Sequence, residues 1–184
     1  MKRTSLTHPL QIATVTAGAG FGSVGLTFCP GKRDRLAMTG AWDRDLGIDL
    51  DAIRAWGSTA LITLVTREEL TLLGVETLGE EVERRHMAWF HLPIVDVSTP
   101  DASFERDWDK VAGGLHARLR QGENVLVHCR GGVGRAGTIA ARLLIELGWM
   151  PGDAIASVRA VRPGAIETRA QERYVLSLDS KASA

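Results

Sequence analysis

A glycine-rich segment between two apolar runs constrains the fold of this 184-residue chain more than any other part of its sequence. The segment reads HCRGGVGRAGT and covers residues 128–138. The apolar run before it, Val125–Val127, suits a buried strand, and the longer run after it, Ile139–Leu147, suits a buried helix. The sequence therefore predicts a sharp turn that leads directly from a strand into a helix.

The composition of this turn is typical of a phosphate site. Gly131, Gly132 and Gly134 allow backbone dihedrals that residues with a Cβ resist. Such a turn aims several backbone N–H groups at one point, with the positive end of the following helix behind them. That arrangement favours a phosphate dianion. Arg135, at the start of the predicted helix, adds a planar guanidinium that can hold two phosphate oxygens.

Cys129 would lie at the base of the same turn, where the positive field stabilises a thiolate. A thiolate beneath a bound phosphate predicts a nucleophile that takes the phosphoryl group. A buried, inert cysteine is the plainer interpretation, but it leaves the glycines and the arginine unexplained. A Walker A loop does not fit, because no lysine separates Gly137 from Thr138.

These residues carry a resemblance to a known family. HCRGGVGR matches the HCxxxxxR signature of cysteine-dependent protein tyrosine and dual-specificity phosphatases. Together with HLPIVDVSTPD upstream and RPGAIET downstream, it most resembles the kinase-associated phosphatase subfamily, over roughly Gly25 to Leu178. The resemblance implies that Cys129 is the nucleophile. It also implies that the phosphoryl oxygens are held by Arg130, Gly131, Gly132, Val133, Gly134 and Arg135.

A phosphatase also needs a proton donor for the leaving oxygen, which a carboxylic acid on a nearby loop can supply. Asp96 follows the predicted strand that ends at Val95 and precedes a predicted helix. The resemblance assigns the acid to the first aspartate of this segment, which is Asp96. The rival, Asp101, is expected in the first turn of the helix, where the helix dipole already explains an acidic residue.

Four further residues are candidates for supporting roles. Glu69 is expected to align Arg135, or else to be an ordinary surface charge. Gln171 forms a capping-box pattern with Thr168. In the family, glutamines near this position place the attacking water, and Glu167 stands where many relatives have glutamine. His128 is expected to order hydrogen bonds around the turn without transferring protons.

Strands alternate with helices along the chain, which predicts a single α/β domain over residues 1–184 with a mixed, mostly parallel sheet covered by helices on both faces. Residues 1–24, a strand and a glycine-rich loop, are expected to be mobile. The loop has GxGxxG spacing at Gly20, Gly22 and Gly25, but a strand follows, which disfavours a dinucleotide site. Beside the central run, strands are expected over residues 12–16, 26–28, 60–65 and 87–95. Helices are expected over residues 50–56, 104–119, 153–161 and 169–178, and a further helix is expected to begin at a capping box of Thr77 and Glu80 and to end near Arg85. Asp49 is the expected N-cap of the first helix, and Ser98–Pro100 are expected to signal the start of the helix over 104–119.

Composition narrows the function classes. The formal net charge is zero, which disfavours a broad nucleic-acid or membrane surface. Two cysteines, Cys29 and Cys129, fit a reducing compartment rather than a disulfide framework, and Cys29 is expected to be structural. No signal sequence or membrane-spanning run is seen, so a cytoplasmic monomer is expected. No histidine pair suggests a metal ion, and no cofactor is expected.

The sequence thus predicts a phosphoprotein phosphatase that works through a cysteinyl-phosphate intermediate. One alternative is a phosphatase for inositides or other small phosphates, which the absence of lysine from the turn RGGVG mildly disfavours. The other is a phosphate-binding module without turnover. The sequence leaves open whether phosphotyrosine or phosphoserine/threonine is preferred.

Overall fold

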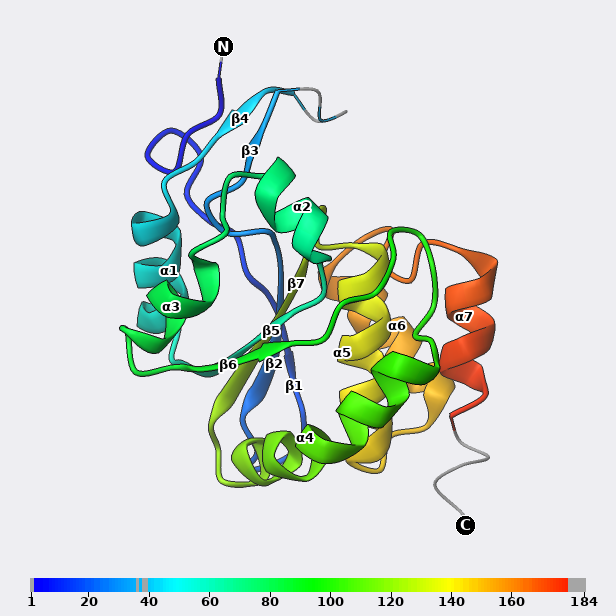
Figure 1. The fold of residues 1–184 in the computed structure, drawn as a ribbon. Helices are drawn as coiled ribbons and strands as arrows, with labels where there is room; N and C mark the ends of the chain where they lie inside the picture. The colour runs from blue at the N-terminus through cyan, green and yellow to red at the C-terminus, as the bar shows by residue number, and fades with distance from the viewer. Residues whose placement is uncertain (1, 36, 38–39, 179–184) are drawn as a thin grey trace.

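A five-stranded sheet with helices on both faces forms the body of the protein in this computed structural model, which describes residues 2–35, 37 and 40–178 (Figure 1). The strands are β1 (Ala13–Thr16), β2 (Ser23–Phe28), β5 (Ser58–Thr63), β6 (Ala88–His91) and β7 (Asn124–Cys129), with a separate pair formed by β3 (Arg33–Asp34) and β4 (Trp42–Asp43). The helices are α1 (Leu46–Ala55), α2 (Arg67–Leu72), α3 (Leu78–Glu83), α4 (Ala102–Arg120), α5 (Gly134–Glu146), α6 (Pro151–Val161) and α7 (Arg169–Leu176).

The predicted mixed, mostly parallel sheet is confirmed. The strand order is β1-β2-β7-β5-β6, and only β1 runs antiparallel to its neighbour. The glycine-rich segment follows β7, the central strand, whose last residue Cys129 pairs with Phe28 of β2. On the other side His128 pairs with Thr63 of β5. The segment therefore leaves the carboxyl end of the parallel strands, where open α/β sheets place their ligands.

Each face of the sheet has its own apolar core, because successive strand residues point to opposite faces. Leu61 of β5 and Leu126 of β7 pack with α1, α2 and α3, on the left of Figure 1. Val125 and Val127 of β7 pack on the opposite face with α4, α5, α6 and α7. The central strand is thus buried on both faces, which explains its unbroken apolar run.

The first helix departs from the expected boundary. It begins at Leu46, and Asp45 rather than Asp49 is its N-cap, accepting a hydrogen bond from Ile48 N at 2.8 Å. Asp49 lies inside the helix and is fully buried, where its carboxylate receives two hydrogen bonds from Arg44, at 2.7 and 2.8 Å. The prediction of Asp49 as the N-cap was wrong, because its carboxylate binds the buried guanidinium of Arg44 and not the backbone N–H groups at the helix start.

A second capping assignment was also wrong. Thr77 precedes α3 but makes no capping hydrogen bond, since its ψ of 6° is far from the extended conformation that an N-cap requires. The capping box lies one helix earlier, between Thr66 and Glu69, where Thr66 has an extended ψ of 169°. The box predicted for Thr168 and Gln171 at the start of α7 is confirmed.

Two further boundaries differ from the expected ranges. The strand expected over 87–95 is shorter, ending at His91, and Pro93 has no backbone N–H with which to extend it. The Ser98–Pro100 segment does not open the next helix, which begins at Ala102 with Asp101 as its N-cap. The loop between these two elements, residues 92–101, is therefore longer than the sequence suggested.

The N-terminal glycine-rich loop joins two antiparallel strands, β1 and β2, and opens no helix, as expected. Gly22 lies so close to Glu123 that an added Cβ would be only 1.8 Å from the backbone carbonyl oxygen of Glu123. The mobility of residues 1–24 stays a prediction. In the described part of the chain, no helix is long and apolar enough to cross a membrane.

Candidate active site

The phosphate loop, residues 129–135, is shaped by glycine and held against the neighbouring strand. Gly132 has a φ of +69°, a conformation that side chains disfavour. A Cβ on Gly132 would lie 2.4 Å from the carbonyl carbon of Thr27 in β2, so only glycine fits. In this conformation the N–H of Gly132 donates to Sγ of Cys129 at 3.2 Å. The loop therefore aims at least one backbone amide at the cysteine sulfur.

The two cysteines differ in their surroundings. Cys129 is buried at the end of β7, five residues before α5 begins at Gly134, and the loop amide of Gly132 donates to its sulfur. Cys29 is fully buried on the adjacent strand end, and burial raises the pKa of its thiol above the ordinary value. A neutral, buried thiol is unreactive, which agrees with the structural role expected for Cys29.

Arg135 lies in the first turn of α5 with its guanidinium almost wholly buried. Its Nη1 lies 2.7 Å from Oε2 of Glu69, and its Nη2 lies 2.8 Å from Oε1 of the same carboxylate. Nη1 also donates to the carbonyl oxygen of Ile94 at 2.8 Å. The predicted contact between Glu69 and Arg135 is thus present and bidentate, although its catalytic value stays a prediction.

Glu69 is itself held from behind. Its Oε2 accepts a hydrogen bond from the backbone N–H of Thr66 at 2.9 Å, in the capping box of α2. Burial alone would raise the pKa of Glu69, but the hydrogen bonds from Arg135 and Thr66 hold it below the usual value. The side chain therefore stays ionised at neutral pH. The signal for this capping box was present in the sequence as T-x-x-E at residues 66–69.

The two rival aspartates have different positions. Oδ1 of Asp96 lies 2.8 Å from Nη2 of Arg135, at the mouth of the phosphate loop, and its side chain is 56% exposed. Asp101 is instead the N-cap of α4, where its Oδ1 accepts from Phe104 N at 2.9 Å. The structure brings Asp96 to the site and gives Asp101 a structural task, and the acid role of Asp96 stays a prediction.

The loop that carries Asp96 is tied to α7. Gln171 is fully buried, and its Nε2 donates to the carbonyl oxygen of Ser98 at 3.1 Å. Its Oε1 accepts from the N–H groups of Glu167 and Thr168, at 3.0 and 3.2 Å. The amide of Gln171 is thus occupied within the fold, so the contacts support its capping role, and water positioning stays a prediction. Oε2 of Glu167 lies close to Gly134, where an added Cβ would meet it at 2.4 Å.

Two β-branched residues beside the phosphate loop have strained backbones. Val97, next to Asp96, has a φ of +55°, and Ile166, next to Glu167, has a φ of +56°. Such values are rare for β-branched side chains and cost of the order of 1–3 kcal/mol each. Strain of this kind concentrates at functional sites, which agrees with the position of both loops at the mouth of the phosphate loop.

His128 is fully buried, and its Nε2 lies 2.8 Å from Oγ1 of Thr63. Burial lowers the pKa of His128 to about 3, with a further contribution from Arg135. The ring is therefore neutral at physiological pH and suits a hydrogen-bonding role rather than proton transfer. Among the described residues, no group of three or more His, Cys, Asp and Glu side chains is placed to hold a metal ion.

Sequence reasoning missed the residues that surround the phosphate loop from outside. Arg130 forms hydrogen bonds to Asp34 of β3, with Nε at 3.1 Å and Nη2 at 2.9 Å from Oδ2. Lys32 and Arg162 donate to backbone carbonyl oxygens of the loop. Arg162 lies in the RPG segment, which reads as an ordinary helix stop, and Lys32 lies about a hundred residues away in sequence from its partner. No role was predicted for either residue, although Arg162 opens the RPGAIET segment that carries the resemblance.

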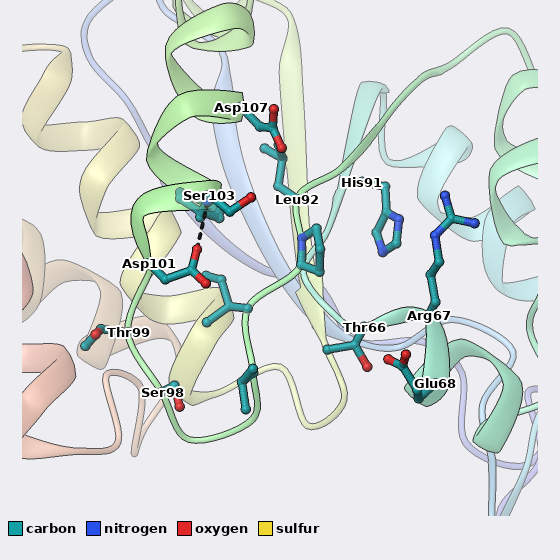
Figure 2. Close-up of a pocket in the computed structure, with 14 residues that line it drawn as sticks. Thr66, Arg67, Glu68, His91, Leu92, Ser98, Thr99, Asp101, Ser103 and Asp107 are labelled. Carbon is teal, nitrogen blue, oxygen red and sulfur yellow. Dashed lines mark hydrogen bonds between the residues drawn. The ribbon is translucent and has the colours of Figure 1, made fainter.

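A cavity of about 680 Å³ lies beside the loop that carries Asp96 (Figure 2). Its walls are the start of α2, with Arg67 and Glu68, and the start of α4, with Asp101 and Asp107. Residues 92–95 and Ser98 also line it, so the cavity shares a wall with the phosphate site. Its size suits a short stretch of peptide next to the phosphate loop.

Comparison with known proteins leads to the same family as the motifs in the sequence. The family model described as Swiss Army Knife protein, DSP-PTPase phosphatase domain, matches residues 44–175, which is most of the chain and includes the phosphate loop. Cyclin-dependent kinase inhibitor 3 of Rattus norvegicus is 32% identical over 144 residues, and its Homo sapiens counterpart is 31% identical over 144 residues. Each match covers 77% of this chain but 66% of the relative, just under two thirds of its length.

Solved structures share the whole architecture. A crystal structure of kinase associated phosphatase, with serine substituted for the catalytic site cysteine, superimposes with a TM-score of 0.81 at 27% identity, covering 96% of this chain and 97% of that one. Tk-PTP in its active form gives a TM-score of 0.66 at 27% identity, covering 92% of this chain and 97% of that one.

Proposed function

Because the chain belongs to the DSP-PTPase family of cysteine-dependent phosphatases, we propose that it removes phosphate from proteins, with Cys129 as nucleophile. The thiolate of Cys129 attacks phosphorus and forms a cysteinyl-phosphate as the ester bond breaks. Asp96 gives its proton to the leaving oxygen and then takes one from the water that releases phosphate. Arg135 and the amides of residues 130–135 hold the phosphoryl oxygens, and no cofactor takes part.

One observation carries this proposal: a buried guanidinium and a backbone amide converge beside a cysteine sulfur. Arg135 is fixed by Glu69 through two hydrogen bonds of 2.7 and 2.8 Å, and Gly132 N–H points at Sγ of Cys129. Preorganised donors of this kind stabilise charge as it develops, without reorganisation during the reaction. Arg135 also touches Asp96, so the anion site and the acid are adjacent.

A phosphorylated protein is favoured over a small polyphosphate by the contacts of Arg130. Arg130 is the one basic residue among residues 130–134, and Asp34 already holds its guanidinium. The carboxylate of Asp34 therefore partly neutralises the charge that Arg130 could offer to a second phosphate. The cavity in Figure 2 leaves room for the peptide around the phosphorylated residue. Because relatives are named kinase associated phosphatase and cyclin-dependent kinase inhibitor, a phosphorylated kinase is a natural first candidate.

The test is a substrate panel with a matched inactive variant. Wild-type protein should release phosphate from phosphopeptides bearing phosphotyrosine or phosphothreonine, and much less from inositol phosphates. Cys129→Ser should abolish turnover but still bind phosphopeptide, because the loop donates mostly through its backbone. The serine variant should then retain phosphorylated partners from a lysate. Substantial turnover by Cys129→Ser would remove Cys129 as the nucleophile.

The panel also decides between the alternatives. Faster release from inositol phosphates than from any phosphopeptide would show a small-phosphate phosphatase. Phosphopeptide binding without release from either class, or from a generic aryl phosphate, would show a binding module.

We further propose that the protein acts as a monomer in a reducing compartment such as the cytoplasm. Its two cysteines are both free, which suits such a compartment. Light scattering of the purified chain tests the first point, and localisation of a tagged chain tests the second.

A further inference from the structure

Three successive carbonyl oxygens of the phosphate loop point at cationic side chains. The carbonyl oxygen of Arg130 accepts a hydrogen bond from Lys32 Nζ at 3.3 Å. The next two belong to Gly131 and Gly132, and both accept from Arg162, at 3.0 Å from Nη2 and 2.9 Å from Nε. Lys32 lies between β2 and β3, and Arg162 is the C-cap of α6, so two distant segments hold one loop from outside.

Peptide geometry connects these contacts to the reaction centre. In a planar trans peptide, the C=O of one residue and the N–H of the next point in opposite directions. The carbonyl of Gly131 faces Arg162, and the N–H of Gly132, from the same peptide group, donates to Sγ of Cys129 at 3.2 Å. Arg162 and the cysteine sulfur therefore lie at the two ends of a single peptide group.

We propose that Arg162 is a positioning residue that fixes the 131–132 peptide and so keeps its N–H aimed at Cys129, with Lys32 fixing the peptide before it. The inference rests on the function proposed above, in which that amide stabilises the thiolate and the phosphoryl group. Gly131 and Gly132 have no side chains of their own to hold the backbone, so their orientation must be secured from outside. A cation on the carbonyl also polarises the peptide and strengthens its N–H as a donor.

The burial of Lys32 supports the same conclusion. The residue is only 4% exposed, and its Nζ lies 4.8 Å from the ring centre of Phe28 and 4.9 Å from that of Trp42. Burial lowers the pKa of Lys32, which shows that its charged form is disfavoured there. An apolar side chain would fill the same space without that cost, so the ammonium is held there by the two aromatic rings and the carbonyl oxygen of Arg130 together.

The experiment compares Arg162→Met with a matched control on the same helix. Arg159 also donates to two carbonyl oxygens, those of Ala165 at 3.1 Å and Ile166 at 3.0 Å, but to none of the phosphate loop. Arg159→Met therefore removes the same charge and the same kind of contact elsewhere, together with an ion pair to Glu172 at 3.1 Å. Two properties are measured: the pH midpoint for alkylation of Cys129 by iodoacetamide, followed on its peptide by mass spectrometry, and the affinity for vanadate.

We expect Arg162→Met to raise the alkylation midpoint by about one pH unit and to weaken vanadate binding about tenfold, as for one lost hydrogen bond to a charged group. Arg159→Met should leave both unchanged. The charged and titratable groups around Cys129 are Arg135, Lys32, Cys29 and His128, and they are the same in every variant.

Arg162→Gln provides a second variant if the methionine variant does not fold, and its expected changes have the same direction. Wild-type values in either folded variant would overturn the proposal, as would an equal shift in Arg159→Met. Neither measurement requires turnover. A protein that binds vanadate but hydrolyses no phosphoprotein would thus contradict the proposed function and still report on Arg162.

Discussion

Glu69 offers the sharpest test of how the site is built, because its carboxylate is the partner of a buried cation. The Arg135 side chain is 1% exposed and that of Glu69 is 13% exposed. Removing one partner of a buried ion pair costs about 3–5 kcal/mol, and here the lower end applies because Asp96, at 2.8 Å from Nη2, remains as a partner of Arg135. Glu69→Gln keeps the shape and one acceptor, which places the expected loss at about 3 kcal/mol.

For a chain of this size, a loss of about 3 kcal/mol lowers Tm by roughly 6–12 °C. The same change should reduce kcat/KM for an aryl phosphate by about 10²-fold, because a misplaced guanidinium no longer meets the phosphoryl oxygens. The matched control is Glu76→Gln, an exposed residue in the turn between α2 and α3. It makes no contact with Arg135 in the structure, so both Tm and kcat/KM should stay at wild-type values.

The pH dependence of this effect has a definite sign. The pKa of Glu69 is lower in the folded protein than in the unfolded chain, so its contribution is present above the unfolded value of about 4.3. It is lost as the pH falls through the lower, folded value. The difference in Tm between wild type and Glu69→Gln should therefore be constant near neutral pH and shrink in acid.

Calorimetry or circular dichroism across this pH range, combined with steady-state kinetics, makes the measurement. A Tm within about a degree of wild type together with normal kinetics would refute the reasoning. Asp96 and the carbonyl oxygen of Ile94 would then be sufficient to hold Arg135.

Two other changes test the chemistry. Asp96→Asn should lower kcat by about 10²–10⁴-fold and remove the alkaline limb of the pH–rate profile. Asp101→Asn should only lower Tm slightly, through loss of a helix cap. The reverse pattern in steady-state kinetics would assign the acid role to Asp101. Ala136, buried directly after Arg135, has no hydroxyl to donate to the departing sulfur, and the Thr138 hydroxyl donates instead to Gly134 O at 2.8 Å. Rapid mixing of the protein with an aryl phosphate should therefore show a burst of phenol followed by a slow steady state, because hydrolysis of the cysteinyl-phosphate is the slow step. Ala136→Ser should shrink the burst and raise kcat about ten- to hundredfold. A linear time course, with no gain in kcat from serine, would contradict this prediction.

The centre of the site could be predicted because its signals are local. A strand, a glycine turn and a helix follow one another in the sequence, so the positions of Cys129 and Arg135 follow from spacing alone. The contact of Glu69 with Arg135 came from resemblance, and the sequence by itself left an ordinary surface charge equally open. Fold class was equally accessible, since alternating strands and helices restrict the topology to few arrangements.

What could not be predicted depends on partners far away in sequence. Asp45 and Asp49 are both reasonable caps for α1, and the choice is made by Arg44, whose buried guanidinium takes Asp49. Likewise, T-x-x-E occurs at both Thr66 and Thr77, and backbone conformation decides which one caps. The role of Arg162 could not be predicted, although it opens the RPGAIET segment that carries the resemblance, because donation to a backbone carbonyl needs no particular residue in the partner.

The strained backbones of Val97 and Ile166 each lower the free energy of unfolding of the protein. Glycine at the exposed Val97 would relieve the strain there, but it would also free the segment that carries Asp96, whereas the buried Ile166 side chain contributes more to the core than its backbone strain costs. Selection for heat resistance alone would therefore favour glycine at Val97, and that gain would loosen the position of Asp96 beside the phosphate loop. In both loops, global stability is lowered by a backbone conformation that keeps the residues around the phosphate loop in place.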